Sequence, residues 1–287
     1  MNFQNLVCVN DHKMNVYIVG SGEKTLVFLA GSGVTAPVLE YKPLYEKFID
    51  TFQIAVVEKA GYGFSESNTG AKRDVLTMMN ESREALNNAG VQPPYILVAH
   101  SYSGIEAVYW ANCFPEEVDA VLGLDMVTPQ YALAQAAELP EEKKLVILDK
   151  QKRMFEKLQR SKFLQKLLKN QTLNASGVWN SGALNDAEKM LYQELFYKNL
   201  CNVEIREEQI EATNNAVLAA QTGKLKVPGH MFISNMKTPL KKTTWLAENT
   251  AFAKENGWQY ETADNHFFYV SSPEQIASVW KKFVESL

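Results

Sequence analysis

The chain of 287 residues has few cysteines and no long apolar run. Its three cysteines, Cys8, Cys113 and Cys201, are odd in number and widely spaced, which predicts neither a disulfide framework nor a metal site. No apolar run reaches the roughly 18 residues of a membrane-spanning helix, so we expect no such span. The first residues lack the basic and apolar parts of a signal peptide. We therefore expect a cytoplasmic protein with buried, reduced thiols.

An excess of positive charge is also missing. Lys and Arg number 29 against 33 Asp and Glu, and the formal net charge is −4. Proteins that bind nucleic acids usually carry a basic surface. We therefore expect a small-molecule substrate as the partner and no nucleic acid. The lack of a membrane-spanning run leads us to expect no membrane partner. Nothing in the composition indicates an oligomeric state.

The chain does have a regular alternation of short β-rich runs with helical patterns. Unbroken apolar runs, such as Leu26 to Leu29, are typical of parallel strands that are covered on both faces. The alternation predicts an α/β fold, with a mostly parallel eight-stranded sheet and helices on both faces. The expected strands are residues 6–9, 14–19, 25–29, 54–58, 95–99, 120–125, 230–233 and 258–262, and the main expected helices are 39–50, 74–89, 240–255 and one that begins at Pro273.

One long segment interrupts this alternation. Between residues 128 and 226 no strand pattern occurs, and Leu, Lys, Glu, Gln and Ala form helical runs such as 145–168 and 186–199. The sequence thus predicts two parts. Residues 1–127 and 227–287 would form an α/β core, and residues 128–226 a helical insertion.

The first candidate for chemistry is Ser101. A buried strand runs into it and a helix leaves directly after it, so the serine would lie on a tight turn at the carboxyl edge of the sheet. Ala99 and Ser103 are small enough to let the strand and the helix approach each other. In the usual Gly-x-Ser-x-Gly pattern both of these positions are glycine. The alternative interpretation is a serine that merely begins a helix.

A nucleophilic serine needs a base, because its free hydroxyl is a weak nucleophile. The chain has four histidines. His266 follows the last predicted strand and would lie on the same edge of the sheet as Ser101. His12 and His230 belong to strands or turns elsewhere, and His100, next to Ser101, is expected to point away from the site.

Four segments in this order resemble the α/β-hydrolase superfamily over nearly the whole chain. They are Phe28 to Gly33 for the oxyanion loop, Glu58 to Ser65 for an Asp-x-x-Gly-x-Gly-x-Ser-like turn, the Ser101 turn, and Asn265 to Phe268 for the histidine loop. The insertion at 128–226 resembles the family's helical cap. The resemblance implies that Glu58 organises its turn and that the backbone N–H groups of Ser32 and Tyr102 form the oxyanion hole.

The third member of the implied triad departs from the usual pattern. Most of the family has an acid after the seventh strand, where residues 233–239 contain no carboxylate. Some relatives place the acid after the sixth strand, and Asp125 lies there. Asp125 is therefore the predicted acid, because His266 would need an anion to fix its tautomer. A purely structural Asp125, with Asn235 as a neutral partner of His266, is the alternative.

The resemblance implies a cofactor-free and metal-free serine hydrolase that cleaves an ester or related acyl bond through Ser101, His266 and Asp125. A serine at the nucleophile position argues against dehalogenase and epoxide-hydrolase chemistry, which in this superfamily depends on an aspartate. A proline-releasing aminopeptidase, a lactonase and a carbon–carbon hydrolase remain open, although the glutamates of the insertion are expected to be solvated. A non-catalytic ligand-binding protein also remains open.

Overall fold

The computed structural model describes residues 2–200, 202–238, 242 and 244–287. Eight strands form one sheet in the order β1-β2-β4-β3-β5-β6-β7-β8. β2 pairs with β1 and β4 antiparallel, and the pairs from β4 to β8 are parallel. The predicted α/β fold with a mostly parallel eight-stranded sheet is confirmed. In chain order, strands β1 to β8 are Leu6–Val9, His12–Val19, Thr25–Leu29, Gln53–Glu58, Tyr95–His100, Val118–Leu124, Gly229–Ser234 and Gln259–Ala263.

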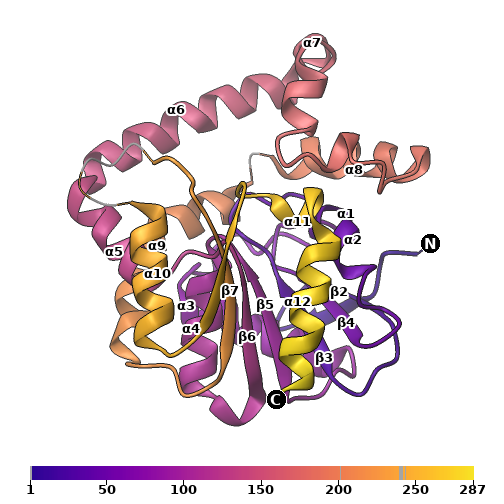
Figure 1. The fold of residues 1–287 in the computed structure, drawn as a ribbon. Helices are drawn as coiled ribbons and strands as arrows, with labels where there is room; N and C mark the ends of the chain where they lie inside the picture. Colours follow the sequence, from indigo (N-terminus) through magenta and orange to yellow (C-terminus); the bar gives the residue numbers. More distant parts are fainter. Residues whose placement is uncertain (1, 201, 239–241, 243) are drawn as a thin grey trace.

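Helices cover both faces of the sheet (Figure 1). One face packs against α1 (Pro37–Glu40), α2 (Lys42–Tyr45), α11 (Phe268–Ser271) and α12 (Pro273–Glu285). The other face packs against α3 (Val75–Asn88), α4 (Ser103–Cys113) and α10 (Trp245–Glu255). β3 and β5 are buried along their whole length, as their unbroken apolar runs require.

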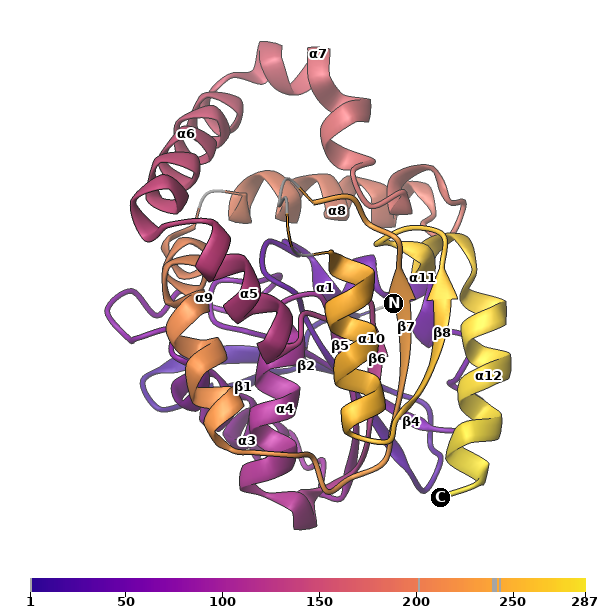
Figure 2. The same ribbon diagram turned by 60° about the vertical axis from the view of Figure 1, so that its left-hand side comes forward.

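The segment between β6 and β7 contains helices, and its described residues form no strand. Figures 1 and 2 show α6 and α7 as an arch at the end of the molecule opposite the C-terminus, with α8 between the arch and the core. The side chain of Asn185 caps α8 in a reciprocal capping box with Glu188. The helices are α5 (Pro129–Glu138), α6 (Glu141–Arg160), α7 (Lys162–Leu173), α8 (Asp186–Asn199) and α9 (Val203–Gln221).

Three helix predictions need correction. The helix expected at 39–50 is two short helices, because Pro43 lacks an N–H and its ring disfavours a continuous helix. The helix expected at 145–168 is broken at Ser161, whose backbone is extended and whose hydroxyl accepts from Leu164 N. The helix expected from residue 240 begins at Trp245, while residues 240, 241 and 243 of that prediction lie outside the described residues.

The register of the parallel strands decides which residues meet at the carboxyl edge. Leu29 of β3 lies beside Ala99 of β5, so the loops that follow these strands are neighbours. His100 lies beside Leu124 of β6, which brings Ser101 next to Asp125. Leu124 in turn lies beside Phe232 of β7. The sheet thus gathers the ends of four strands that are distant in sequence.

Candidate active site

Ser101 occupies the turn between β5 and α4. Its φ of +52° is in the left-handed region, which a non-glycine residue rarely adopts. The Ser101 carbonyl accepts hydrogen bonds from Gly104 N at 3.0 Å and from Val127 N at 2.7 Å. These bonds hold the strained turn in place, as is common where a side chain must be presented at a functional site.

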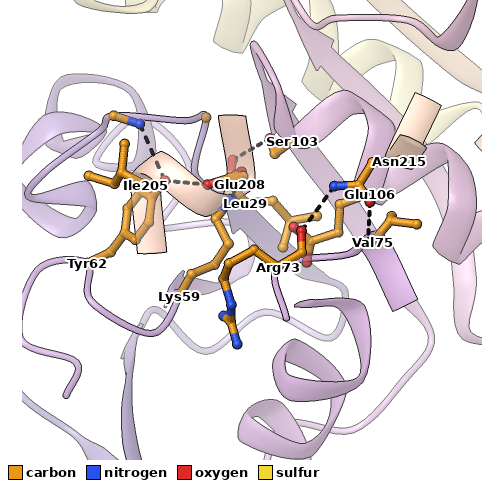
Figure 3. A network of polar contacts seen from close by, with 12 residues as sticks. Leu29, Lys59, Tyr62, Arg73, Val75, Ser103, Glu106, Ile205, Glu208 and Asn215 are labelled. Atoms are coloured by element: carbon orange, nitrogen blue, oxygen red, sulfur yellow. Dashed lines mark hydrogen bonds and ion pairs between the residues drawn. The ribbon is translucent and has the colours of Figure 1, made fainter. Parts of the chain in front are cut away.

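Ser103 takes the place of a usual glycine and adds contacts of its own. Its hydroxyl accepts from His100 N at 2.9 Å and donates to the Leu29 carbonyl at 2.8 Å, a contact drawn in Figure 3. It therefore ties the Ser101 turn to the end of β3. The next residue must be glycine, because a Cβ at Gly104 would lie 2.3 Å from the Val127 carbonyl oxygen.

Asp125 and His266 are joined by a short hydrogen bond. His266 Nδ1 lies 2.7 Å from Asp125 Oδ2, although 141 residues separate them in the chain. Asp125 is 1% exposed and has a φ of +45° directly after β6. Asn235, the alternative partner, is exposed. The structure thus brings together the two residues whose pairing the sequence analysis favoured.

Other donors also converge on the Asp125 carboxylate. Oδ1 accepts from Ser234 N and from Trp245 Nε1, both at 2.6 Å, and Oδ2 accepts from the Ser234 hydroxyl at 2.6 Å. With His266 Nδ1, four polar groups contact the carboxylate and fix its position beside the imidazole. An anion held in this way keeps the His266 proton on Nδ1 and leaves Nε2 as an acceptor.

His266 Nε2 and Ser101 Oγ share no hydrogen bond in the described part of the chain. Both residues are partly exposed on neighbouring loops at the same edge of the sheet. Hydrogen bonds of this kind often form only when a substrate closes the site. The arrangement can therefore position a base beside the Ser101 hydroxyl.

The loop after β3 lies against the Ser101 turn. A Cβ at Gly31 would be 2.8 Å from the His100 carbonyl oxygen and 2.9 Å from Ser101 Cβ, so only glycine allows this approach. Ser32 follows directly, and Tyr102 lies at the start of α4. The two residues predicted to form the oxyanion hole therefore lie on segments that contact or adjoin Ser101.

His100 lies behind His266, and the expectation that it points away from the site is wrong. The centroids of the two imidazole rings are 4.7 Å apart. His100 Nε2 is 3.3 Å from the His266 carbonyl oxygen, and Nδ1 is 3.3 Å from the Tyr41 hydroxyl. Because the His266 carbonyl oxygen can only accept, His100 carries its proton on Nε2, and Nδ1 accepts from the Tyr41 hydroxyl. The same hydroxyl accepts from Gly31 N.

This chain of hydrogen bonds connects the loop before Ser32 to the loop that carries His266. Burial, and then the neighbouring His266, hold the pKa of His100 well below its usual value, so its ring stays neutral as the bonding requires. Sequence reasoning missed His100 and Tyr41. The only signal was that a polar residue ends a wholly buried strand directly before the candidate nucleophile.

Glu58 lies where the resemblance implied an organising residue. Its carboxylate accepts from Phe64 N, Val38 N and Asn15 Nδ2. These contacts hold the turn after β4 against α1 and β2. Burial raises the pKa of Glu58 to about 7.

Three glutamates of the inserted helices are buried, and the expectation that they are solvated is wrong. Glu208 pairs with Lys59 Nζ at 2.5 Å and accepts from the Tyr62 hydroxyl (Figure 3). Glu188 pairs with Lys42 Nζ at 2.6 Å, and Glu204 accepts from Asn68 N at 2.8 Å. These carboxylates join the insertion to the core, and their partners belong to the protein itself.

A cavity of about 450 Å³ lies between the inserted helices and the core. Phe155 and Leu158 of α6, Phe196 of α8 and Ile205 of α9 give it mainly apolar walls. Gly33, next to Ser32, and Thr35 contribute the core side. A volume of this size suits a small organic ligand, and the walls favour an apolar one.

Two of the cysteines are exposed, namely Cys8 and Cys113, so the prediction of buried thiols is wrong for them. Cys201 lies outside the described residues. Within those residues, no group of three or more His, Cys, Asp or Glu side chains could hold a metal ion. No helix of the described chain is long and apolar enough to cross a membrane.

Comparison with solved structures shows the fold. An epoxide hydrolase from Bacillus megaterium, in complex with an inhibitor, superposes with a TM-score of 0.70 at 14% identity and covers 98% of this chain and 100% of its own. A haloalkane dehalogenase variant from Bradyrhizobium elkanii superposes with a TM-score of 0.62 at 15% identity, with 98% and 96% covered. At identities this low, the superpositions establish the architecture only, and the chemistry must be argued from the residues of the site.

Comparison with curated sequences shows closer relatives. No known family model matches the chain. The uncharacterised protein YqjL of Bacillus subtilis is 34% identical over 126 residues, which cover 43% of this chain and 47% of YqjL. The uncharacterised protein YbdG of the same organism is 32% identical over 288 residues, which cover 98% of this chain and 86% of YbdG. The chain therefore has the α/β-hydrolase fold and belongs to the same family as YbdG.

Proposed function

We propose that the protein is a serine hydrolase that cleaves an ester or related acyl bond in a small, mainly apolar molecule. The observation that carries this proposal is the 2.7 Å hydrogen bond between His266 Nδ1 and buried Asp125, at the edge of the sheet where Ser101 lies on a strained turn. A base whose tautomer is fixed by an anion is what a serine nucleophile requires.

The proposed reaction begins when His266 Nε2 takes the proton of Ser101 and Oγ attacks the substrate carbonyl carbon. The N–H groups of Ser32 and Tyr102 stabilise the negative charge that develops on the carbonyl oxygen. His266 gives the proton to the departing alcohol, which leaves an acyl group on Ser101. His266 then activates water, which releases the acid and restores Ser101.

The choice of an acyl bond over an epoxide follows from the nucleophile. Attack of a serine hydroxyl on an epoxide carbon would form an ether, which has no carbonyl carbon for water to attack. An aspartate would form an ester in the same reaction, and water can hydrolyse that ester. Ser101 therefore favours an acyl substrate, although several structures with the same fold are epoxide hydrolases.

The cavity and its surroundings bear on the rival functions. Its apolar walls suit the acyl or alkyl part of an ester. An aminopeptidase would need a free carboxylate for the substrate amine, and two of the buried glutamates, Glu188 and Glu208, are unsuited to that because they already pair with Lys42 and Lys59. A purely ligand-binding protein would not need the Asp125–His266 hydrogen bond. We propose residues 128–226 as the cap that supplies most of the specificity.

The test is covalent labelling of purified protein with a fluorophosphonate probe, followed by peptide mapping. We expect the wild type to be labelled at Ser101, and labelling to vanish in Ser101→Ala and to slow strongly in His266→Ala. Hydrolysis of p-nitrophenyl esters should depend on the same residues. If the folded wild type stays unlabelled and hydrolyses esters no faster than Ser101→Ala, the proposal is wrong.

A further inference from the structure

The arch formed by α6 and α7 has a charge opposite to that of the whole chain. From residue 141 to residue 173, ten Lys and Arg face four Asp and Glu, while the complete chain has a net charge of −4. α7 itself contains three lysines and no Asp or Glu, and Arg160 at the end of α6 adds a fourth positive charge next to it. Positive charge is thus concentrated on one part of the molecule.

The outer face of α6 combines these charges with exposed apolar side chains. Ile147, Lys150, Met154 and Lys157 follow one another at intervals of three or four residues, which places them on one side of a helix. Ile147 and Met154 are 45% and 56% exposed. The face begins with Lys143 and includes no carboxylate at these positions.

α7 repeats the pattern. Phe163, Lys166, Leu167 and Asn170 occupy positions i, i+3, i+4 and i+7, and all four are exposed. Phe163 is 73% exposed and Leu167 is 66% exposed. Large apolar side chains this exposed, on two successive helices, exceed the single scattered cases that a protein surface normally shows.

Packing within the molecule does not account for these outer faces. The adjoining side of α6, about 100° around the helix, carries Leu148, Phe155 and Leu158, which line the cavity described above. α6 therefore has one apolar side toward the cavity and another toward solvent. Figures 1 and 2 show the arch at an extremity of the molecule, where the outer side is accessible to a large partner.

We propose that the arch docks on an anionic lipid surface, with Phe163 and Leu167 as its main apolar anchors. Helices that lie on membranes carry Lys or Arg beside exposed bulky apolar residues, and negative headgroups attract the charges. Long lysine side chains can reach the headgroups while their stems stay among apolar groups. We accordingly replace the expectation of no membrane partner, which rested on the absence of a spanning helix.

The same chemistry fits other macromolecules less well. Protein interfaces are depleted of lysine, whereas here Lys alternates with the apolar residues. Proteins contact nucleic acids mainly through positive and polar groups. Nucleic-acid binding would therefore not explain why Phe163, Leu167 and Met154 are exposed. An anionic bilayer accounts for both components at once.

This docking would place the cavity next to the lipid. Inner residues of α6 form its wall, so an apolar molecule dissolved in the bilayer would have a short path to it. Only this delivery of an apolar ester to the cavity rests on the proposed function. Lipid binding itself requires no catalysis.

The test is co-sedimentation of the full-length protein with vesicles of phosphatidylcholine, with and without phosphatidylglycerol. We expect binding to the anionic vesicles only, and weaker binding at high salt. Lys162→Glu/Lys166→Glu should weaken binding by at least about 25-fold, since each lysine near an anionic surface contributes roughly fivefold. Phe163→Ser/Leu167→Ser should also weaken binding, without a change in net charge.

The matched control is Lys254→Glu/Lys282→Glu, which changes the net charge equally on exposed residues at the ends of α10 and α12. It should bind like the wild type. Equal loss in the control, equal binding to both kinds of vesicle, or no binding to either would overturn the proposal. The proposal would also be overturned if the wild type formed a dimer that dissociates in Phe163→Ser/Leu167→Ser. Binding of an oligonucleotide instead of vesicles would overturn it as well. Hydrolysis of a soluble ester, measured on the same variants, reports separately on the proposed function.

Discussion

Replacing Asp125 with asparagine should change the tautomer of His266 while the surrounding structure is kept. Oδ1 of Asp125 faces Ser234 N and Trp245 Nε1, which can only donate. In the Asp125→Asn variant the amide oxygen would therefore stay in the place of Oδ1, and the amide NH₂ would replace Oδ2. That NH₂ would face His266 Nδ1, which would then have to accept.

The consequence is a proton on the wrong nitrogen. With Nδ1 as acceptor, the neutral His266 carries its proton on Nε2 and cannot take one from Ser101. Replacement of a triad aspartate by asparagine lowers kcat by roughly 10⁴-fold in serine proteases, which corresponds to about 5 kcal/mol of activation free energy. We expect a loss of that order for Asp125→Asn at neutral pH, with KM little changed.

The assay is steady-state hydrolysis of a p-nitrophenyl ester that the wild type cleaves, with thermal unfolding of each variant as a check of folding. Asp119→Asn, on the same strand and only partly buried, is the matched control and should keep its rate within about twofold, as surface changes away from special contacts usually do. If Asp125→Asn is folded and retains a tenth or more of the wild-type kcat, Asp125 does not fix the His266 tautomer and the reasoning fails.

Three further predictions concern the geometry around Ser101 and the stability of the fold. Gly31→Ala should lower kcat by roughly 100-fold, because its Cβ would displace the Ser101 turn, and circular dichroism should show a retained fold; an unchanged kcat would contradict the close approach. Glu208→Ala should lower the free energy of unfolding in urea by about 3–5 kcal/mol, because Lys59 is left buried and unpaired, whereas exposed Glu194→Ala should have little effect. Burial lowers the pKa of His230 to about 4, so the stability that it confers above pH 6.5 should be lost as pH falls from 6.5 toward 4, by up to about 3 kcal/mol. His230→Asn, which keeps an acceptor for Trp280 Nε1, should lack that part of the pH dependence, and identical pH profiles would refute the assignment.

The fold was predictable because its signals are local. Buried parallel strands need unbroken apolar runs, and Thr25–Leu29 and Tyr95–His100 supply them. A small residue on each side of Ser101 is likewise visible in a few letters of sequence. Chain order then places Ser101 and His266 at one edge of the sheet, since each follows a parallel strand.

The support of the site was less predictable because it depends on side-chain directions across the sheet. Nothing near His100 in sequence shows that its ring lies 4.7 Å from that of His266. The partners of Glu208 are Lys59 and Tyr62, at sequence separations of 149 and 146 residues. A charged residue on a helix predicts solvent exposure by default, and only its partners can reverse that expectation.

The arch shows a related limit of helical periodicity. A single apolar stripe predicts which side of a helix faces the core, but α6 has apolar residues on two sides. Leu148 and Leu158 are buried, while Ile147 and Met154 are exposed, and the sequence pattern alone treats all four as candidates for the core. Once the structure separates them, the exposed pair needs its own explanation. The lysines interspersed with that pair then favour a partner that is both apolar and negatively charged, which chain-wide averages of charge and hydropathy conceal.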